Sequence, residues 1–386
     1  MTNEVAQGPD NLKSLTSLRF FAAISIVFLH AKLYADWQWL GILPPTLVHG
    51  VSFFFVLSGF ILTHAYSSRP DMSFGRFMQL RVARLWPAHA CSFLLVLVFI
   101  RPVAFDGSGV FSPYVVSVFN ILLLQSLFPF DAYLFSFNSV SWSISTEIFF
   151  YVAFPFLCVN IQTAWLRNLI VAALFITLLF YALMSSGLPA SSTNPFDVTV
   201  SSATYANPAS RLFEFVLGMA TWVIWKRHLQ PLKIAPWLWT VAEAAILSVA
   251  GFWLIKFYSV AYVNFPLPWM LFWFSTSGSC FVFAMLIAAL ASGKGLISRT
   301  LSLAPVVWLG EVSFCIYLTH QILFKLIAWN RPDLTTPTIY FTALIALAAS
   351  MHHGIEKPGR AFIRGLGRPR RHTPSRLQAS GASKAK

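Results

Sequence analysis

The stretch RFFAAISIVFLH, residues 19–30, decides the class of this protein and holds its first candidate site. It is an apolar run with a guanidinium, Arg19, at one end and an imidazole, His30, at the other. In an α-helix this spacing is about three turns, so both side chains lie on nearly one face, about 16 Å apart along the axis. The apolar run extends from Leu15 to Tyr34, which is long enough to cross a bilayer.

Titratable groups at membrane depth are costly and usually face a protein interior or a wet cavity. This favours a functional role for His30 over a simple hydrogen bond to a neighbouring helix. For Arg19, a functional role and a purely structural role, as a cation at the N-terminal end of the helix, are equally supported.

The composition indicates an all-α polytopic membrane protein. The 386-residue chain is 57% hydrophobic and only 10% charged, whereas soluble domains carry about 25% charged residues. The apolar runs are long and continuous, as membrane-spanning helices require. A transmembrane β-barrel would instead show short segments of alternating hydrophobicity.

Eleven apolar segments are expected from the hydropathy pattern. They lie near residues 15–34, 47–66, 88–106, 113–128, 142–160, 165–185, 210–226, 236–256, 268–291, 303–327 and 338–355.

Basic residues next to apolar spans mark the cytoplasmic side. This rule places the loops 67–87, 226–235 and 292–300 inside, together with the C-terminal tail. The segment 113–128 then has no crossing left to make, and it carries Asn120 and Gln125 in its middle. We therefore expect it to be re-entrant or packed within the bundle, which leaves about ten transmembrane helices and two cytoplasmic termini.

The remaining loops are expected outside, at 35–46, 129–141, 186–209, 257–267 and 328–337. The pattern divides the chain into three parts. These are a cytoplasmic N-terminal segment, 1–14, a transmembrane domain, 15–356, and a basic, disordered cytoplasmic tail, 357–386.

The net charge of +14 does not indicate a nucleic-acid partner, because the topology already explains it. Nine Lys or Arg and no acidic residue lie in the tail after Glu356. The four cysteines share no C-x-x-C spacing and fall in apolar runs, so they are expected to be small core residues and not metal ligands or disulfides.

Two further constellations place chemistry at membrane depth. Ser143 and Glu147 are four residues apart and share a helical face, and a carboxylate there, brought to His30, would orient a base. A structural hydrogen bond between helices is the alternative. Arg81 and Arg84 lie three apart before Pro87, a spacing suited to gripping a phosphate, although positive-inside charge explains them equally well.

A last polar set lies in the segment GEVSFCIYLTH, where Ser313 and His320 are two turns apart. Tyr317 lies between them on the same span. Near the end of the last span Glu356 precedes Pro358, and there a structural role is the stronger interpretation.

Taken together, these motifs resemble the acyltransferase-3 family of integral membrane acyltransferases, which O-acetylate bacterial cell-surface and exported glycans. Matching elements follow one another along nearly the whole chain: Arg19 and His30, SFFFVLSGF (Ser52 to Phe60), Arg81 and Arg84, Trp142 with Ser143 and Glu147, RLFEFVLG (Arg211 to Gly218), Ser313 with Phe314, Tyr317 and His320, and Glu356 with Pro358. Phe314 departs from the family pattern, in which a tyrosine is common.

The resemblance implies a multi-pass protein of the bacterial inner membrane with a cytoplasmic acyl-CoA donor, most simply acetyl-CoA, and a carbohydrate or glycolipid acceptor. No bound cofactor is expected. His30 would be the catalytic base, with Glu147 as its orienting partner. Arg19, Ser143, Tyr317 and His320 would position the substrates, and Arg81 and Arg84 would bind the donor.

Two other functions fit the same residues. In a proton-coupled transporter or flippase of a glycan or lipid, intramembrane His and Glu side chains would relay protons. In a purely structural membrane partner, His30 would be replaceable. The sequence does not specify the acceptor, the length of the acyl group or the oligomeric state.

Overall fold

The computed structural model describes residues 12–35, 37–68, 72–100, 108–264, 268–330 and 336–366. In chain order its helices are α1 (Lys13–Tyr34), α2 (Gly50–Tyr66), α3 (Phe74–Leu95), α4 (Pro113–Ile121), α5 (Asp131–Leu134), α6 (Trp142–Cys158), α7 (Ile161–Ser185), α8 (Val200–Thr204), α9 (Pro208–Ile224), α10 (Pro236–Asn264), α11 (Pro268–Ser277), α12 (Cys280–Ala291), α13 (Leu296–Leu301), α14 (Ala304–Asn330), α15 (Pro337–Met351) and α16 (Lys357–Gly365).

The predicted all-α polytopic class is confirmed. Within the described ranges, nine helical stretches are long and apolar enough to cross a membrane. Another expected span, near 210–226, corresponds to α9, which is not among these nine. Almost every side chain of α9 is buried, including Arg211 and Glu214, whereas α7 and α10 expose long apolar faces of the kind that lipid covers.

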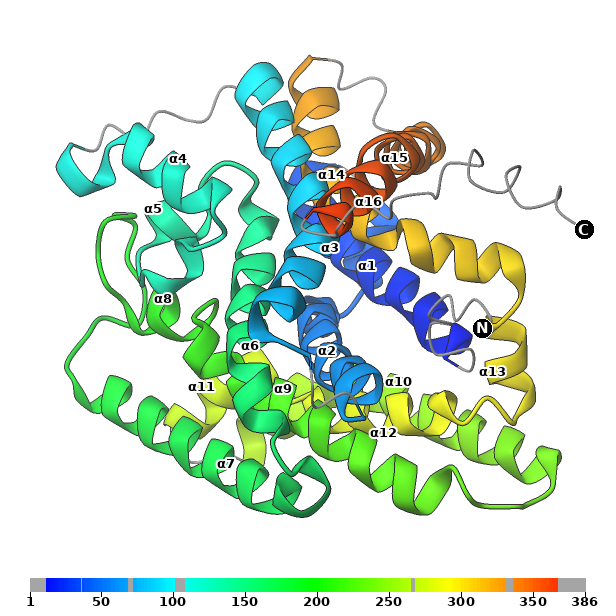
Figure 1. The fold of residues 1–386 in the computed structure, drawn as a ribbon. Helices are drawn as coiled ribbons and strands as arrows, with labels where there is room; N and C mark the ends of the chain where they lie inside the picture. Colours follow the sequence, from blue (N-terminus) through cyan, green and yellow to red (C-terminus); the bar gives the residue numbers. More distant parts are fainter. Residues whose placement is uncertain are drawn as a thin grey trace, which may run out of the picture.

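The helix α1 lies in the middle of the bundle, against α14 and α2 (Figure 1). Its contact with α14 is close because a glycine removes the intervening side chain. A Cβ atom on Gly310 would lie 2.0 Å from the carbonyl oxygen of Thr16. The helices α2 and α9 also meet at two glycines, because a Cβ on Gly59 or on Gly218 would lie 2.0 Å from a backbone oxygen of the other helix. Small residues at such crossings are typical of membrane helices.

The region 67–87 differs from the predicted inner loop. The helix α3 begins at Phe74, well before the expected start at residue 88, and Ser73 caps it by accepting a hydrogen bond from the amide of Arg76 (3.3 Å). Pro87 lies inside this helix. The arginine pair, Arg81 and Arg84, therefore lies on the membrane helix itself. A proline inside a membrane helix is tolerated when neighbouring groups satisfy the backbone carbonyl that it leaves without a hydrogen bond.

The helix in segment 113–128 is too short to cross the bilayer, as expected from the assignment of the loops to the two sides of the membrane. The helix α4 has nine residues, which is about 14 Å of helix. The chain then turns through Leu123, whose φ is +59°. Asn120 and Gln125 are buried and donate to Ser136 and Ser141, with Nδ2–Oγ and Nε2–Oγ distances of 2.9 and 3.1 Å.

Loops predicted to share a membrane side lie together in the structure. Between two predicted inner loops, Lys294 Nζ donates to the carbonyl of Gln230 (2.8 Å). Between two predicted outer loops, the Ala132 amide donates to the carbonyl of Pro195 (3.0 Å). These contacts agree with the predicted alternation of sides, while which face is cytoplasmic stays a prediction.

The beginning of the predicted disordered tail is a helix, so that expectation is wrong for residues 357–365. A π-helical turn, His352–Glu356, links α15 to α16, and Pro358 stands in the first turn of α16, where proline is favoured. The helix α16 packs on α3. Residues 367–386 and most of the N-terminal segment, 1–11, lie outside the described residues.

Candidate active site

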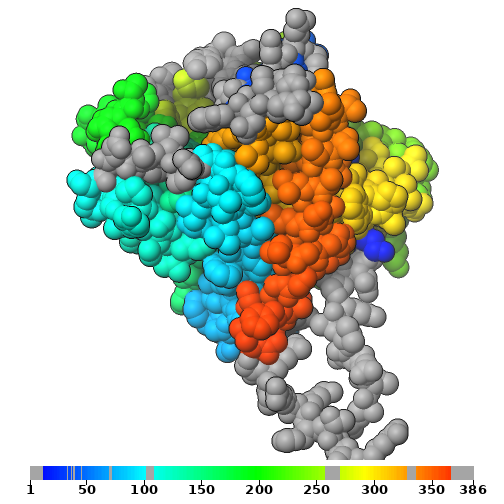
Figure 2. Space-filling model, turned by 90° about the horizontal axis from the view of Figure 1, so that it is seen from above, coloured from blue at the N-terminus to red at the C-terminus, as the bar shows by residue number. Residues whose placement is uncertain are grey.

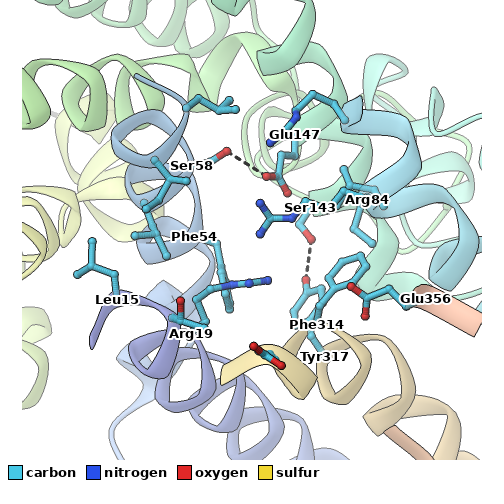
Figure 3. Close-up of a pocket in the computed structure, with 18 of the residues that line it drawn as sticks. Leu15, Arg19, Phe54, Ser58, Arg84, Ser143, Glu147, Phe314, Tyr317 and Glu356 are labelled. Atoms are coloured by element: carbon cyan, nitrogen blue, oxygen red, sulfur yellow. Dashed lines mark hydrogen bonds between the residues drawn. The ribbon is translucent and has the colours of Figure 1, made fainter. Parts of the chain in front are cut away.

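A cavity of about 620 Å³ lies between α1, α2, α3, α6, α14 and the C-terminal helix. Figure 3 shows side chains from these elements converging on it. Six cationic and three carboxylate side chains line it: Lys13, Arg19, Arg81, Arg84, Lys357, Arg360, Glu147, Glu311 and Glu356. We call it the arginine cavity. Its surplus of positive charge is suited to an anionic ligand.

The carboxylate of Glu147 has its own partners in this cavity. Its Oε1 accepts hydrogen bonds from Ser58 Oγ (3.0 Å) and from the hydroxyl of Tyr151 (2.5 Å). Arg19 and Arg84 line the same cavity, and neither guanidinium forms a hydrogen bond with another described residue. Two guanidiniums with free donors in one wall form a site for phosphate or carboxylate oxygens.

Arg81 is held more firmly by the protein than Arg84 is. It is 8% exposed, and its Nη2 donates to the hydroxyl of Tyr66 (2.8 Å). The guanidinium carbon also lies 5.2 Å from the centre of the Tyr66 ring, a cation–π distance. The predicted donor-binding pair is therefore unequal, because Arg84 presents more free donors to the cavity.

A second, smaller cavity of about 80 Å³ contains His30. Four aromatic side chains, Phe135, Trp142, Tyr205 and Tyr317, line it together with the polar side chains of Ser139 and Gln321. We call it the histidine cavity. Aromatic faces beside hydrogen-bonding groups are typical of sites that hold a small part of an amphipathic ligand.

His30, which lines the histidine cavity, pairs with His320 of α14, which is not among the lining residues. Their facing atoms, His30 Nδ1 and His320 Nε2, are 2.8 Å apart. The other nitrogen of His320, Nδ1, lies 2.6 Å from the carbonyl oxygen of Tyr317. A carbonyl oxygen only accepts, so His320 Nδ1 carries a hydrogen, and in the neutral ring Nε2 is the acceptor.

It follows that His30 donates through Nδ1 and keeps the lone pair on Nε2 free. This is the arrangement of a general base whose tautomer a neighbour holds in place. The prediction that Glu147 orients His30 is therefore wrong, because the partner of His30 is His320. The chain places His320 on the adjacent helix α14 within reach of His30, whereas Glu147 lines the arginine cavity and bonds to Ser58 and Tyr151.

Two residues, Val51 and Tyr317, line both cavities and form the wall between them. The hydroxyl of Tyr317 lies 2.8 Å from Ser143 Oγ and donates to the carbonyl of Val140 (3.0 Å). The predicted positioning residues Ser143 and Tyr317 therefore meet at this wall, as Figure 3 shows.

A cysteine, a histidine and a glutamate meet at the edge of the arginine cavity. Glu356 Oε2 accepts hydrogen bonds from His352 Nδ1 (2.7 Å) and Cys315 Sγ (3.2 Å). All three are buried, and their ligand atoms are close enough to be considered for a metal ion. The hydrogen bonds account for the geometry, because 2.7 Å is an ordinary N–H···O⁻ distance.

Sequence reasoning missed several residues of the two cavities. Ser58, Tyr151, Gln321, His352 and Arg360 were not proposed, and Glu356 was assigned only a structural role. For Ser58 a signal existed, because it lies in the SFFFVLSGF motif. Arg360 was hidden in the tail, whose basic composition was attributed to topology.

Comparison with known proteins gives the same family as the motifs. The family model described as "Acyltransferase domain", Acyl_transf_3, matches residues 12–351. The acyltransferase MdmB of Streptomyces mycarofaciens is 31% identical over 81% of this chain and 79% of its own length. No solved structure matches the chain.

Two further relatives are the peptidoglycan O-acetyltransferase OatA of Listeria monocytogenes, 24% identical over 87% of this chain, and the O-acetyltransferase OatA of Staphylococcus aureus, 25% identical over 82%. The chain spans about half the length of each of these two, 53% and 51%. The match identifies an enzyme and so favours a transferase over the transporter alternative. The chain therefore belongs to the Acyl_transf_3 family and is a membrane acyltransferase whose relatives include O-acetyltransferases.

Proposed function

We propose that this protein is an O-acetyltransferase that moves an acetyl group from cytoplasmic acetyl-CoA to a hydroxyl of a carbohydrate on the other side of the membrane. The observation that carries the proposal is the meeting of two unlike cavities at one wall. The arginine cavity offers donors for phosphates, and the histidine cavity offers a base, with Tyr317 between them.

The arginine cavity is the donor site in this proposal. CoA carries its charge on phosphates at one end and its thioester at the other. Arg19 and His30 lie about 16 Å apart along α1, a span that the uncharged pantetheine arm has to cover if its phosphates stay near the arginines. The thioester then arrives at the wall formed by Val51 and Tyr317.

The chemical step uses His30 as the base. An acceptor hydroxyl in the histidine cavity gives its proton to His30 Nε2 and attacks the thioester carbon. The C–O bond forms, the C–S bond breaks, and the electron pair leaves on the CoA sulfur as a thiolate. His320 accepts from His30 Nδ1 and so keeps the ring in the tautomer that can take this proton.

Gln321 is our candidate donor for the oxyanion that develops on the thioester carbonyl. Its Oε1 accepts from Ser139 Oγ, which leaves the two N–H donors of the amide for other partners. The side chain lines the histidine cavity. Hydrogen-bond donors placed beside such an oxyanion are commonly a large contribution to acyl transfer.

The acceptor class is inferred from the relatives and from the cavity lining. The Listeria relative is named for peptidoglycan, an acetylated carbohydrate polymer. The aromatic side chains of the histidine cavity, among them Trp142 and Tyr205 with ring centres 5.0 Å apart, give apolar faces on which a sugar ring packs. The small volume of this cavity fits one hydroxyl and its neighbouring carbons better than a whole polymer unit.

The test is acceptor-dependent release of CoA by the purified protein. Acetyl-CoA and a peptidoglycan or other glycan fragment are supplied, free thiol is measured, and the product is examined by mass spectrometry for added acetyl. We expect thiol release in proportion to acetylated glycan, and His30→Ala abolishes both. If glycan crosses a vesicle membrane without any thiol release, transport and not transfer is the activity.

The proposed sidedness has its own test. A reporter fused after Lys386 is expected to read cytoplasmic, and one inserted in the loop 186–209 is expected to read on the opposite side. The protein is proposed to reside in the bacterial inner membrane. A tail reporter that reads outside would reverse the assignment of the arginine cavity to the cytoplasmic face.

A further inference from the structure

We propose that α16, the helix after the last span, completes the donor site, and that Arg360 on it binds the 3′-phosphate of CoA. The inference rests on the proposed function, because it assumes a CoA donor. It assigns a ligand to a helix that the sequence places in a basic tail and that lies beyond the region matched by the family model, residues 12–351.

The helix α16 is fixed against α3 by side-chain hydrogen bonds to backbone carbonyls and by a close glycine contact. Gln79 Nε2 donates to the carbonyls of Ile363 and Leu366, both at 2.8 Å. Gly359 packs so closely on Pro87 that an added Cβ would lie 2.7 Å from its ring. Figure 2 shows α16 (red) lying against the first turns of α3 (blue). Its side chains therefore have defined positions relative to the arginine cavity.

The two faces of α16 have opposite character. Phe362, which is 70% exposed, and Leu366 point away from the protein. Lys357 and Arg360 line the arginine cavity. An amphipathic helix at a membrane surface ordinarily keeps its basic residues in water and its apolar residues in lipid. Here a basic residue is directed into the protein instead, which calls for an anionic partner inside.

Arg360 has no such partner within the described chain. Its guanidinium forms no hydrogen bond with any described residue, and its Nε is buried without one. Its charged neighbours are mainly other guanidiniums, those of Arg84, Arg364 and Arg81, with Glu356 as a carboxylate among them. Like charges gathered at partly buried positions are unfavourable unless an anion is bound between them.

The order of the guanidiniums matches the order of charged groups along CoA. Arg84 is a charged neighbour of both Arg19 and Arg360, whereas Arg360 is not among the charged neighbours of Arg19. Arg84 therefore lies between them, and the three form a row from Arg360 on α16 to Arg19 on α1. In CoA the 3′-phosphate is the charged group farthest from the thioester, and the pyrophosphate comes next. With the thioester at the His30 end, the outermost guanidinium, Arg360, meets the 3′-phosphate.

A lipid phosphate at the membrane surface would also be a partner for Arg360. Comparing CoA with 3′-dephospho-CoA as ligands distinguishes a lipid phosphate from the 3′-phosphate of CoA. The experiment measures binding of CoA and of 3′-dephospho-CoA to the full-length protein in detergent by calorimetry, without acceptor. We expect Arg360→Gln to weaken CoA binding about tenfold or more, as for loss of a charge-assisted hydrogen bond. Binding of 3′-dephospho-CoA is expected to be unchanged.

The matched control is Arg299→Gln, an exposed arginine on the same predicted side that does not line the cavity. It is expected to leave both affinities unchanged. Arg360→Lys, which keeps the charge and the fold, is expected to restore part of the CoA affinity. Detergent melting curves of all variants check that the protein remains folded.

Each remaining outcome decides something. If Arg360→Gln leaves CoA binding intact, or weakens CoA and 3′-dephospho-CoA equally, the assignment to the 3′-phosphate is wrong while the proposed function stands. Equal affinity of the wild type for CoA and 3′-dephospho-CoA also overturns the assignment. If the wild type binds neither ligand, the proposed CoA donor fails and the inference fails with it.

Discussion

The two cavities differ in almost every physical property although they share a wall. The arginine cavity is large, cationic and built from both ends of the described chain, whereas the histidine cavity is small and largely apolar, with one histidine, His30, in its lining. Recognition of a highly charged donor needs many contacts that are equally strong before and during the reaction. The chemical step needs a few groups that act only on the reacting atoms. This difference supports the proposal that the first cavity binds the donor and that the chemical step takes place in the second.

The largest expected effect is in the histidine cavity. His30→Ala removes the base, so we expect kcat for acetyl transfer to fall by about 10²–10⁴-fold, the usual contribution of general acid–base catalysis. Donor binding, measured by calorimetry, should stay near the wild-type value. A variant that loses donor affinity as severely as turnover would contradict the division between the cavities.

The pairing of His30 with His320 predicts the next largest effect. His320→Ala removes the acceptor that orients His30 Nδ1–H, so kcat falls, though less than in His30→Ala. The double variant is expected to lose little more than His30→Ala alone, because residues of one catalytic unit are not additive. Steady-state rates of the four proteins form the cycle. Losses that multiply would show that the two histidines act independently.

In the arginine cavity the expected effect lies on the donor KM. Arg84→Gln removes a guanidinium with free donors, so the KM for acetyl-CoA should rise about tenfold, with kcat nearly unchanged because the lost contact is uniform binding. Arg299→Gln serves as the control with equal charge change. An unchanged donor KM would show that Arg84 does not bind the donor, and its charge would then be explained by the positive-inside rule alone.

The wall between the cavities predicts the smallest effect. Tyr317→Phe removes the hydroxyl that meets Ser143 and Val140 but keeps the ring, so turnover should fall only about fivefold, the scale of one neutral hydrogen bond. Tyr133→Phe, which removes a hydroxyl bonded to Val110 and lines neither cavity, is the control. A loss as large as that of His30→Ala would place Tyr317 in the chemical step.

The sequence predicts features that depend on neighbouring residues in the chain better than features that depend on contacts between distant segments. Hydropathy and helical spacing act locally, so the all-α class, the run from Arg19 to His30, and the short segment around Asn120 were all accessible. The start of α3 was missed because its first turns carry arginines and read as a loop. Helix α16 was missed because only its packing on α3, through Gly359 and Pro87, reveals that it is ordered.

The partner of His30 shows the other limit. Residues brought together by packing between distant helices leave no periodicity in the sequence. The sequence therefore pairs His30 with Glu147 only because both are costly to bury, and it assigns His320 a positioning role. The structure distinguishes Glu147 from His320 because α14 lies directly against α1 at the close contact of Gly310 with Thr16. That contact sets the register that brings His320 to His30.

The arginine cavity draws its lining from Lys13 in the first described helix and from Arg360 in the last. A chain that emerges from the ribosome in order inserts its helices one after another, so this cavity has no complete wall until α16 has been made. A nascent or truncated chain without α16 also lacks Arg360, so under the proposed function it would bind the donor less well than the full chain does. Because α16 follows α15 in the chain, the cavity is completed only after the helices that precede α16 have been made.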